Sequence, residues 1–408
     1  MAKDTRAPKT RIRAKTLLGA VKDVAAAVQA KTTIPILSNV LISAGDGLLT
    51  LTGTDLDVQA VRECATDDRD GPGSKEWLES IRPFAVCLPA KALLALLGEL
   101  DGDAMVTIAA EDDATASAPG RVTISAGRAR FRLHSAATAD FPRLTPSDWE
   151  HSFEIKASVL ADAFARVGHA ISTEETRYYL NGVFVHPVDS DLRLATTDGK
   201  RLARLALDAP VGAATWPAMI VGRVSVGVLD KLLGAAEKAD EGAMVEIETN
   251  PTGSMLSLRM PAADGGSIEL TAKAIDGTYP DYQRVIPSSS PRELRVNRHT
   301  LAEVAKRVGA LADAKSRVLK FEIEPDLIRV TASTLDIGEA SEELPCSYDG
   351  DAVTLGLDGK YLREALGAIG ADDVVMRFDD AAGPVRLEAS SSAQDAPRLT
   401  QVVMPVHV

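Results

Sequence analysis

The chain has 408 residues, of which 45% are hydrophobic and 25% charged, and its formal net charge is −13 at pH 7. This length predicts about two to four domains, and the average globular composition excludes disordered and collagen-like proteins. No stretch approaches the roughly 18 to 20 apolar residues of a membrane span, and no signal-peptide core follows the basic N-terminus. We therefore expect a cytoplasmic protein without membrane contact. Cys64, Cys87 and Cys346 lie far apart, which argues against a disulfide framework or a thiolate zinc site.

One pattern of elements occurs three times along the chain, at intervals of about 140 residues. The first copy opens with a short strand from Arg11 and an amphipathic helix at 15–31, followed by alternating strands at 40–43 and 49–52. A second helix at 90–100 and a strand from Asp103 complete it. Alternation with a period of two predicts sheets with one covered face and one wet face.

The second and third copies repeat this order. The second has a strand from Phe153, a helix at 156–171, strands at 182–185 and 192–195, a helix at 227–239 and a strand from Gly242. The third has a strand from Leu294, a helix at 300–312, strands at 319–323 and 328–331, a helix at 359–369 and a strand from Asp373. Leu18, Leu160 and Leu301 are predicted to occupy equivalent positions in the first helix of each copy.

Proline-rich segments that follow Phe141 and Tyr279 are typical of linkers between compact domains. We predict three α+β domains, each with two helices and about eight strands. They span residues 1–147, with a short basic N-terminal extension, then 148–289 and 290–408.

The six predicted helices are basic although the whole chain is acidic. They contain twelve Lys or Arg and seven Asp or Glu residues. A positive row of helices inside an acidic molecule could face phosphate groups, which bind through Lys and Arg. Alternatively, these cations only solvate exposed helix faces, and the count alone does not decide between the two.

Catalytic motifs are missing from the sequence: there is no GxxxxGK[ST] loop, no GxGxxG after a strand, no HExxH and no GxSxG. Asp55 and Asp57 could share one strand face as magnesium ligands, but solvation of a loop edge is the simpler interpretation. The segment TTDGKR from Thr196 could hold a phosphate, although the same composition makes an ordinary turn.

Several blocks resemble the bacterial β sliding clamp family, the processivity subunit of DNA polymerase III. They are TIPILSN from Thr33 with LTGTDL from Leu51, RYYLNG from Arg177, ATTDGKRLA from Ala195, YPDYQRVIP from Tyr279 and VVMPV from Val402. The resemblance implies three repeated DNA-clamp domains, each with two helices packed on antiparallel sheets. It also implies that two chains form a ring around duplex DNA, and that the protein is neither an enzyme nor dependent on a cofactor.

Domain size independently supports a ring of two chains. A domain of about 135 residues has a radius of gyration near 14 Å, so six in a circle could leave a hole of roughly 30 Å around a duplex about 20 Å wide. Three domains could not enclose it. We therefore predict a homodimer closed by head-to-tail contacts.

The resemblance also implies two sets of contact residues. Lys31, Tyr178 and Tyr179 match DNA-contacting positions, with a core role of the tyrosines as the alternative. Glu174 stands where many relatives have Gln, which puts the contact with DNA at this position in doubt. The partner-peptide cleft is implied to comprise Arg177, Tyr179, Leu180, Thr197, Gly199, Lys200, Arg201, Leu202, Pro280, Arg284, Val285, Tyr361, Val402, Met404, Pro405 and Val406.

In the family this cleft binds peptides of the type Gln-Leu-x-Leu-Phe. The implied partners are the DNA polymerase III α subunit, the clamp loader complex and other proteins with this motif. Lys200, Pro384, Val406 and His407 depart from the family pattern, so partner preference is left open. Two other functions are alternatives: a specialised clamp paralogue for repair, a mobile element or inhibitor resistance, and a metal-dependent hydrolase using Asp55, Asp57 or Asp198.

Overall fold

The computed structural model describes residues 9–29, 31–45, 48–65, 83–111, 118–145, 148–288, 290–313, 316–334, 336–390 and 398–408. The predicted basic extension at 1–8 lies outside these ranges. The chain divides into two compact units, unit 1 (Met1–Ala161 and Gly227–Ala274) and unit 2 (Asp162–Val226 and Ile275–Val408). Within the described ranges, no helix is both long enough and apolar enough to cross a membrane.

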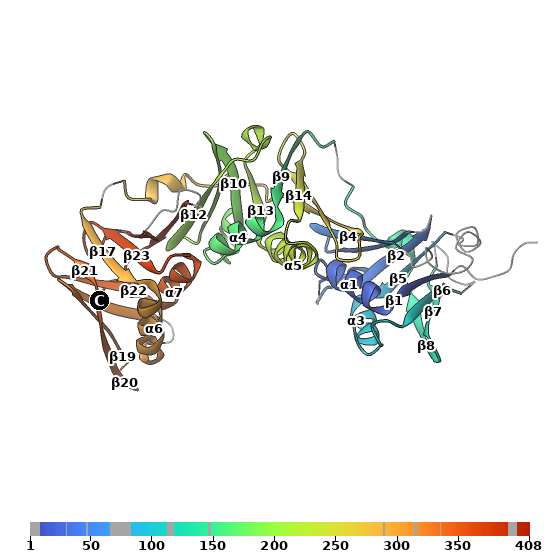
Figure 1. Ribbon diagram of the computed structural model, residues 1–408, viewed down its shortest axis with the longest axis horizontal. Helices are drawn as coiled ribbons and strands as arrows, with labels where there is room; N and C mark the ends of the chain where they lie inside the picture. Colours follow the sequence, from blue (N-terminus) through green and yellow to red (C-terminus); the bar gives the residue numbers. More distant parts are fainter. Residues whose placement is uncertain are drawn as a thin grey trace, which may run out of the picture. The chain divides into compact units, whose positions relative to one another are not determined.

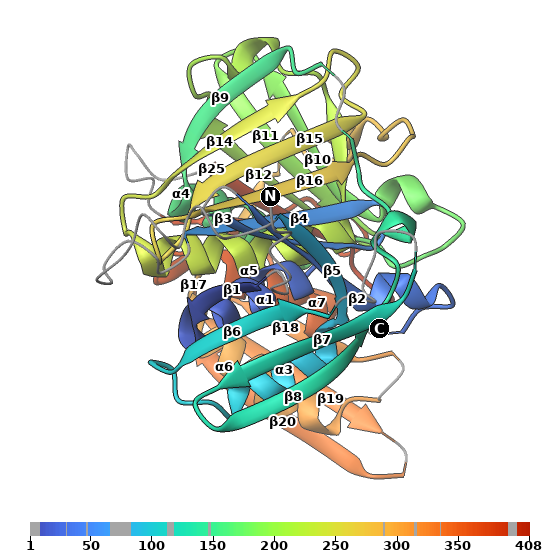
Figure 2. The ribbon, with the colours of Figure 1, turned by 90° about the vertical axis from the view of Figure 1, so that its right-hand side faces the viewer.

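Unit 1 contains two antiparallel sheets, with the strand orders β1-β6-β7-β8 and β5-β2-β3-β4-β16-β15-β14-β9 (Figures 1 and 2). Strand β16 pairs with β4, with Leu270 opposite Ala60. The strands are β1 (Lys9–Arg13), β2 (Asn39–Gly45), β3 (Leu48–Thr54), β4 (Val58–Ala65), β5 (Phe84–Pro89), β6 (Met105–Ala110), β7 (Gly120–Ala126), β8 (Ala129–Ser135), β9 (His151–Lys156), β14 (Met244–Thr249), β15 (Met255–Pro261) and β16 (Ser267–Lys273).

Unit 2 contains a nine-stranded sheet of order β13-β10-β11-β12-β25-β24-β23-β17-β21 and a four-stranded sheet of order β20-β19-β18-β22. Strand β25 pairs with β12, with Val402 opposite Leu202. The strands are β10 (Gly182–Val188), β11 (Asp191–Thr197), β12 (Arg201–Asp208), β13 (Met219–Gly222), β17 (Arg292–Asn297), β18 (Val318–Glu324), β19 (Leu327–Thr334), β20 (Gly338–Pro345), β21 (Ser347–Tyr348), β22 (Val353–Asp358), β23 (Asp373–Phe378), β24 (Val385–Ala389) and β25 (Arg398–Val403).

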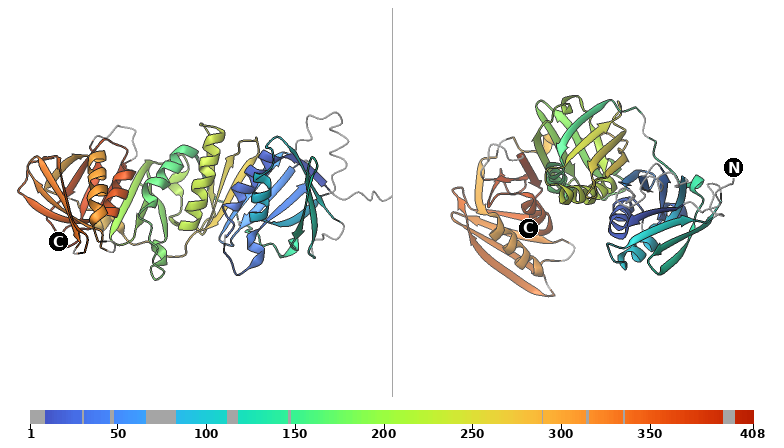
Figure 3. Two further views of the ribbon diagram at one scale, coloured as in Figure 1. Left: turned by 90° about the horizontal axis from the view of Figure 1, so that it is seen from below. Right: turned by 45° about the vertical axis from the view of Figure 1, so that its right-hand side comes forward.

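The helices cover sheet faces with apolar stripes. In α1 the buried side chains of Leu17, Ala20, Val21 and Val24 recur at the spacing of one helix face, and α1 contacts α3, β3 and β4. In unit 2, α6 contacts α7, β19 and β20 (Figure 3). The helices are α1 (Ala14–Ala25), α3 (Ala90–Gly98), α4 (Ala157–Gly168), α5 (Arg223–Ala239), α6 (Arg298–Val308) and α7 (Gly359–Ala368).

Three details of the predicted helices were wrong. The first helix ends at Ala25 rather than at residue 31, because the N–H groups of residues 26–28 donate to carbonyls three residues back, which tightens the last turn and ends the α-helical ladder. Its buried leucine is Leu17, one residue before the predicted Leu18, and it matches the fourth-position leucines of α4 and α6. Helix α5 begins at Arg223, four residues before the predicted start.

Strand pairing joins the predicted repeats into common sheets. The pair β4 and β16 links the first repeat to the second, and the pair β12 and β25 links the second to the third. Among the described residues, the predicted domains contain eight, eight and nine strands in order, with two helices each. The pairing in unit 2 brings the end of β25 beside the turn between β11 and β12, where the predicted partner-binding residues gather.

Candidate functional site

The turn between β11 and β12 is held by its own side chains. The Asp198 carboxylate accepts the backbone N–H groups of Lys200 (2.9 Å) and Arg201 (3.1 Å). Thr197 Oγ1 accepts the N–H of Gly199, whose φ of +86° suits glycine. Since the amides that a phosphate would need are already donated to Asp198, the ordinary-turn interpretation of this segment fits its geometry.

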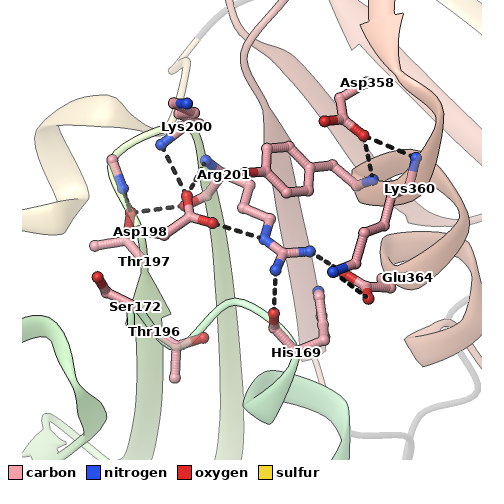
Figure 4. Close-up of polar contacts among 12 residues, drawn as sticks. His169, Ser172, Thr196, Thr197, Asp198, Lys200, Arg201, Asp358, Lys360 and Glu364 are labelled. Atoms are coloured by element: carbon pink, nitrogen blue, oxygen red, sulfur yellow. Dashed lines mark hydrogen bonds and ion pairs between the residues drawn. The ribbon is translucent and has the colours of Figure 1, made fainter. Parts of the chain in front are cut away.

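Arg201 ties this turn to α7. Its side chain is only 9% exposed, and its Nε donates to Asp198 Oδ2 at 3.0 Å. The other two guanidinium nitrogens donate to the Glu364 carboxylate and to the His169 carbonyl (Figure 4). The guanidinium also stacks over the Tyr361 ring, 4.2 Å from its centroid. Because each of its three guanidinium nitrogens already donates to the protein, Arg201 mainly holds the turn against α7 and supports the cleft from below.

Two partly buried histidines make the stability of unit 2 dependent on pH. Burial, followed by the charge of a nearby arginine, lowers the pKa of His169 and of His186 from 6.5 to about 4. The unfolded chain therefore binds more protons than the folded chain, so stability falls as the pH drops from about 6.5 towards 4. Such a shift is worth about 3 kcal/mol for a fully buried ring. Partial exposure screens it, and we expect about 3 kcal/mol for the pair.

Urea unfolding at pH 7.5 and pH 5.0 checks this dependence. The double variant His169→Gln and His186→Gln should lose much of the difference between the two pH values, since neither glutamine titrates. The control His407→Gln removes an exposed histidine of the same unit and should keep the difference. If the double variant kept the full difference in unfolding free energy between pH 7.5 and pH 5.0, His169 and His186 would not be its cause.

Arg177 braces the same turn from outside. Its guanidinium forms two 2.8 Å hydrogen bonds with the Glu174 carboxylate and a third, of 3.0 Å, with the Asp198 carbonyl. The hydrogen bonds from Arg177 lower the pKa of Glu174. A Cβ at Gly199 would lie 2.6 Å from Arg177 Nη1, the flexible end of that side chain, so it is the φ of +86° that requires glycine there. Glu174 thus binds Arg177.

Three of the predicted apolar cleft residues belong to the core. Leu180, Leu202 and Val402 are 2 to 3% exposed and lie in a buried cluster with Tyr279. Tyr179 packs against this cluster and is partly buried. These leucines and this valine therefore support the surface from below and contribute little area to it.

The C-terminal segment crosses this region as an extended chain. The Met404 N–H donates to the Lys200 carbonyl at 2.9 Å, and the Val406 N–H donates to the Gly356 carbonyl at 2.8 Å. Pro405 lies between them. Met404 and Val406 are 39% and 40% exposed, so the backbone is fixed while two large apolar side chains face solvent.

A hollow of about 320 Å³ lies beside Met404. Three segments of unit 2 form it: residues 284–287, the turn between β23 and β24, and the chain after β25. Its lining is Arg284, Val285, Pro287, Asp379, Asp380, Gly383, Pro384 and Met404. Arg284, Val285 and Met404 were in the predicted set, whereas Pro280 is exposed and absent from the lining.

The remaining lining residues were missed by sequence analysis. Asp379, Asp380 and Gly383 belong to the run DDAAGP at 379–384, of which only Pro384 was singled out. Such a run indicates a turn but does not show which cavity the turn will face. That information comes from the pairing of β24 with β25.

The three predicted DNA-contacting residues differ in exposure. Lys31 is exposed and follows the end of α1 instead of lying within it. Tyr178 is 53% exposed, whereas Tyr179 is partly buried against the core cluster. The two rings meet edge to face at 5.9 Å. The alternative of a core role therefore fits Tyr179 better than Tyr178.

The six described helices contain twelve Lys or Arg and six Asp or Glu residues. Some of the cations are engaged locally: Lys15 pairs with Asp103 at 2.8 Å, and Lys306 lies 3.9 Å from Glu303. Others are exposed and have no ion pair with a described residue; these are Lys22, Lys91, Lys231 and Lys238. These four remain available to an external anion.

The acidic residues considered for metal binding have structural partners. Asp55 Oδ1 accepts the N–H groups of Asp57 and Val58, which closes the turn before β4. Asp57 pairs with Lys273 at 3.2 Å. Among the described residues, no group of three or more His, Cys, Asp or Glu side chains could hold a metal ion.

Comparisons with known proteins agree along the whole chain. Models of the DNA polymerase III β subunit match with the N-terminal domain at residues 9–145, the central domain at 154–281 and the C-terminal domain at 283–407. The β sliding clamp of Caulobacter vibrioides is 32% identical over 396 residues, covering 96% of this chain and 98% of the relative. That of Escherichia coli K12 is 28% identical over 392 residues, covering 96% and 98%.

Solved structures are similar as well. The DnaN sliding clamp of Bartonella birtlesii, bound to griselimycin, superposes with a TM-score of 0.86 at 30% identity and covers 99% of this chain and 100% of its own. A Caulobacter crescentus β sliding clamp gives 0.85 at 31% identity, covering 98% and 99%.

The repeated two-helix domains and these matches define a DNA sliding clamp, a processivity factor that is not an enzyme. DNA and a DNA polymerase are the partners of this class. The chain belongs to the family of the DNA polymerase III β subunit, the bacterial β sliding clamps. The predicted family, fold class and function are thereby confirmed, and the metal-dependent hydrolase and specialised-paralogue alternatives are not favoured.

Proposed function

We propose that two copies of this chain close head to tail into a ring around duplex DNA. The edge strands of the two four-stranded sheets support this arrangement. Strand β8 presents exposed Arg130 and Arg132, and strand β20 presents exposed Glu339 and Glu343. An edge strand leaves a row of backbone groups unpaired. A basic edge on one copy can pair with an acidic edge on the other, and this heterologous contact closes after two copies.

Charge reversal tests this interface. The wild-type protein should have a solution mass of about twice the 43.1 kDa of one chain. Two repulsive cross-strand charge pairs should cost each interface about 2 kcal/mol. Since the ring contains two such interfaces, the dimer should become roughly 1,000-fold weaker. We therefore expect Arg130→Glu with Arg132→Glu to shift the mass towards one chain in light scattering at low protein concentration.

The compensating change provides the control. Adding Glu339→Arg and Glu343→Arg to the same chain should restore the dimer, because each copy carries both edges. A wild-type mass of one chain at micromolar concentration would contradict the ring. If the arginine reversals abolished the dimer and the added glutamate reversals did not restore it, β8 and β20 would not pair with each other.

In this ring the protein tethers a polymerase by topology, and its own contacts with DNA are weak. The unpaired helix lysines, Lys31 and the exposed Tyr178 ring support such contacts. Lysines bind phosphates without reading base sequence, and their affinity falls as salt rises, so the ring can slide. The ring thus holds the polymerase on the duplex. We propose that the protein acts in the cytoplasm, where bacterial DNA is replicated.

We further propose that the surface around Met404 binds short peptides of the DNA polymerase III α subunit, the clamp loader complex and other proteins with the motif Gln-Leu-x-Leu-Phe. The partner-binding residues named from sequence are the proposed site, in which the more exposed residues contact the peptide and the buried ones support the surface. The buried ones are Arg201, Leu180, Leu202 and Val402. The observation that carries the proposal is the exposed Met404, which lines a hollow together with Val285, Pro287 and Pro384. An unbranched Met side chain can adapt to different peptide side chains.

Fluorescence anisotropy with a labelled Gln-Leu-x-Leu-Phe peptide tests this proposal. The intact protein should bind it with a micromolar dissociation constant, and a chain that lacks residues 404–408 should not. Met404→Ala, which keeps the backbone bond to Lys200, should weaken binding about 10-fold because one apolar contact is lost. Val211→Ser, at an exposed site of the same unit, should have no effect. Undiminished binding by the truncated chain would refute the assigned surface.

A further inference from the structure

The hollow beside Met404 has charges of opposite sign on different segments. Arg284 lies on the segment that leads away from the core cluster, and Asp379 with Asp380 lies on the turn between β23 and β24. Val285, Pro287, Pro384 and Met404 supply the apolar surface between them. A ligand in this hollow therefore meets apolar walls, one cation and two carboxylates.

The two carboxylates are free to act on a ligand. Asp380 Oδ1 accepts the N–H groups of Ala382 (2.8 Å) and Gly383 (2.7 Å), which fixes the turn. Neither Asp379 nor Asp380 forms an ion pair with another described residue. The nearby Arg292 directs its N–H groups to the Asp379 carbonyl, to Tyr348 Oη and to the Asp351 carbonyl. The turn thus carries two negative charges outside any ion pair with the described residues, and the charge of Arg292 acts on Asp379 from nearby.

The hollow is also preformed. Pro287 and Pro384 restrict the backbone on two of its sides, and the Asp380 hydrogen bonds hold the turn between β23 and β24. Arg386 Nη1 donates to the Pro287 carbonyl at 3.0 Å, which ties the first segment to β24. A rigid apolar hollow loses little conformational entropy when a peptide enters it. What remains uncovered is Val285, 49% exposed, and Met404, 39% exposed.

We propose that Asp379 and Asp380 make this hollow select peptides that carry a Lys or Arg next to the apolar anchor residues. This inference rests on the proposed peptide cleft and specifies its preferred occupant. A basic side chain beside the anchor would lie against the two carboxylates while the anchor covers Val285 and Met404. An acidic side chain at the same place would meet like charge, which lowers affinity for that partner.

Anisotropy with four labelled peptides tests the selection. All four contain Gln-Leu-Ala-Leu-Phe, and they carry a single Lys or a single Glu directly before or directly after it. On one side of the motif the Lys peptide should bind about 5- to 10-fold more tightly than its Glu counterpart, and the ratio should shrink in 0.5 M salt, at which charges are screened within about 4 Å.

Charge-removing variants locate the effect. Asp379→Asn with Asp380→Asn should reduce the ratio to about one, and the amide oxygen of the second asparagine can still accept the two turn N–H groups. Asp349→Asn removes an exposed charge of the same unit outside the hollow and should leave the ratio unchanged. Equal binding of Lys and Glu peptides to the wild type overturns this inference and leaves the cleft intact. Binding of none of the four overturns both.

Discussion

Replacing Arg62 with Met should cost unit 1 about 3 to 5 kcal/mol of stability, the range for breaking a buried ion pair by removing one partner. The Arg62 side chain is 4% exposed on β4. Its Nε lies 3.2 Å from Asp23 Oδ2 on α1, and its Nη2 pairs with Asp264 in the turn before β16. Methionine fills similar space but leaves both carboxylates without a counter-charge.

The loss should depend on pH in a defined direction. Burial raises the pKa of Asp23, and Arg62 counteracts this effect. Without Arg62 the folded-state pKa rises further above its unfolded value, so the variant regains stability as the pH falls and Asp23 becomes protonated. Urea unfolding of Arg62→Met should therefore show a larger defect at pH 7.5 than at pH 5.

Two comparisons isolate the buried charges. Arg259→Met breaks a pair with Glu269, but Arg259 is 58% exposed, and the expected cost is below about 1 kcal/mol. Adding Asp23→Asn and Asp264→Asn to Arg62→Met removes the uncompensated carboxylates and should recover much of the loss. Equal effects of Arg62→Met and Arg259→Met would show that burial does not amplify the interaction.

Replacing Arg201 with Met should affect both the stability of unit 2 and the proposed peptide binding. Asp198 and Glu364 would lose their shared partner, and the Tyr361 ring would keep only the more distant of its two cations, Arg317. Because Glu364 is 34% exposed, we expect about 3 kcal/mol, towards the lower end for such pairs. The turn that carries Lys200 would loosen, and with it the attachment of Met404, so the peptide dissociation constant should rise at least about 10-fold.

The control for this variant is Arg295→Met on β17. Arg295 is 49% exposed and pairs with Glu293 at 2.6 Å, so its loss should change stability by less than about 1 kcal/mol and leave peptide binding intact. Chemical unfolding and anisotropy on the same preparations separate the two effects. A stable Arg201→Met variant with wild-type affinity would show that this network supports neither the fold nor the cleft.

Sequence patterns predicted local elements well because those patterns are local. Alternation identified β2, β3, β10, β11, β18 and β19, and the threefold repeat identified the helices that follow each opening strand. The end of α1 was wrong because residues 26–31 carry no strong stop signal until the β-branched run begins. The contact between Asp23, Arg62 and Asp264 could not be predicted, since its members are far apart in sequence and meet only through the pairing of β4 with β16.

In the partner-binding set, too, the sequence predicted local features but not contacts between distant segments. Resemblance placed Arg201 among contact residues, whereas its burial and four partners make it a supporting residue. Met404 and Val285 were named as peptide-binding residues because short blocks of sequence carry them, and both line the surface hollow. Asp379 and Asp380 were not, because only the folded turn reveals which wall they form.

The pairing of β4 with β16 has a consequence for synthesis on the ribosome. Ala60 must wait for Leu270, its partner in the ladder, which is translated about 210 residues later. At roughly 5 to 20 residues per second this delay is about 10 to 40 seconds. Throughout that time the nascent chain presents the unpaired edge of β4, an aggregation-prone surface. The first repeat therefore completes its larger sheet only after the second repeat has been translated.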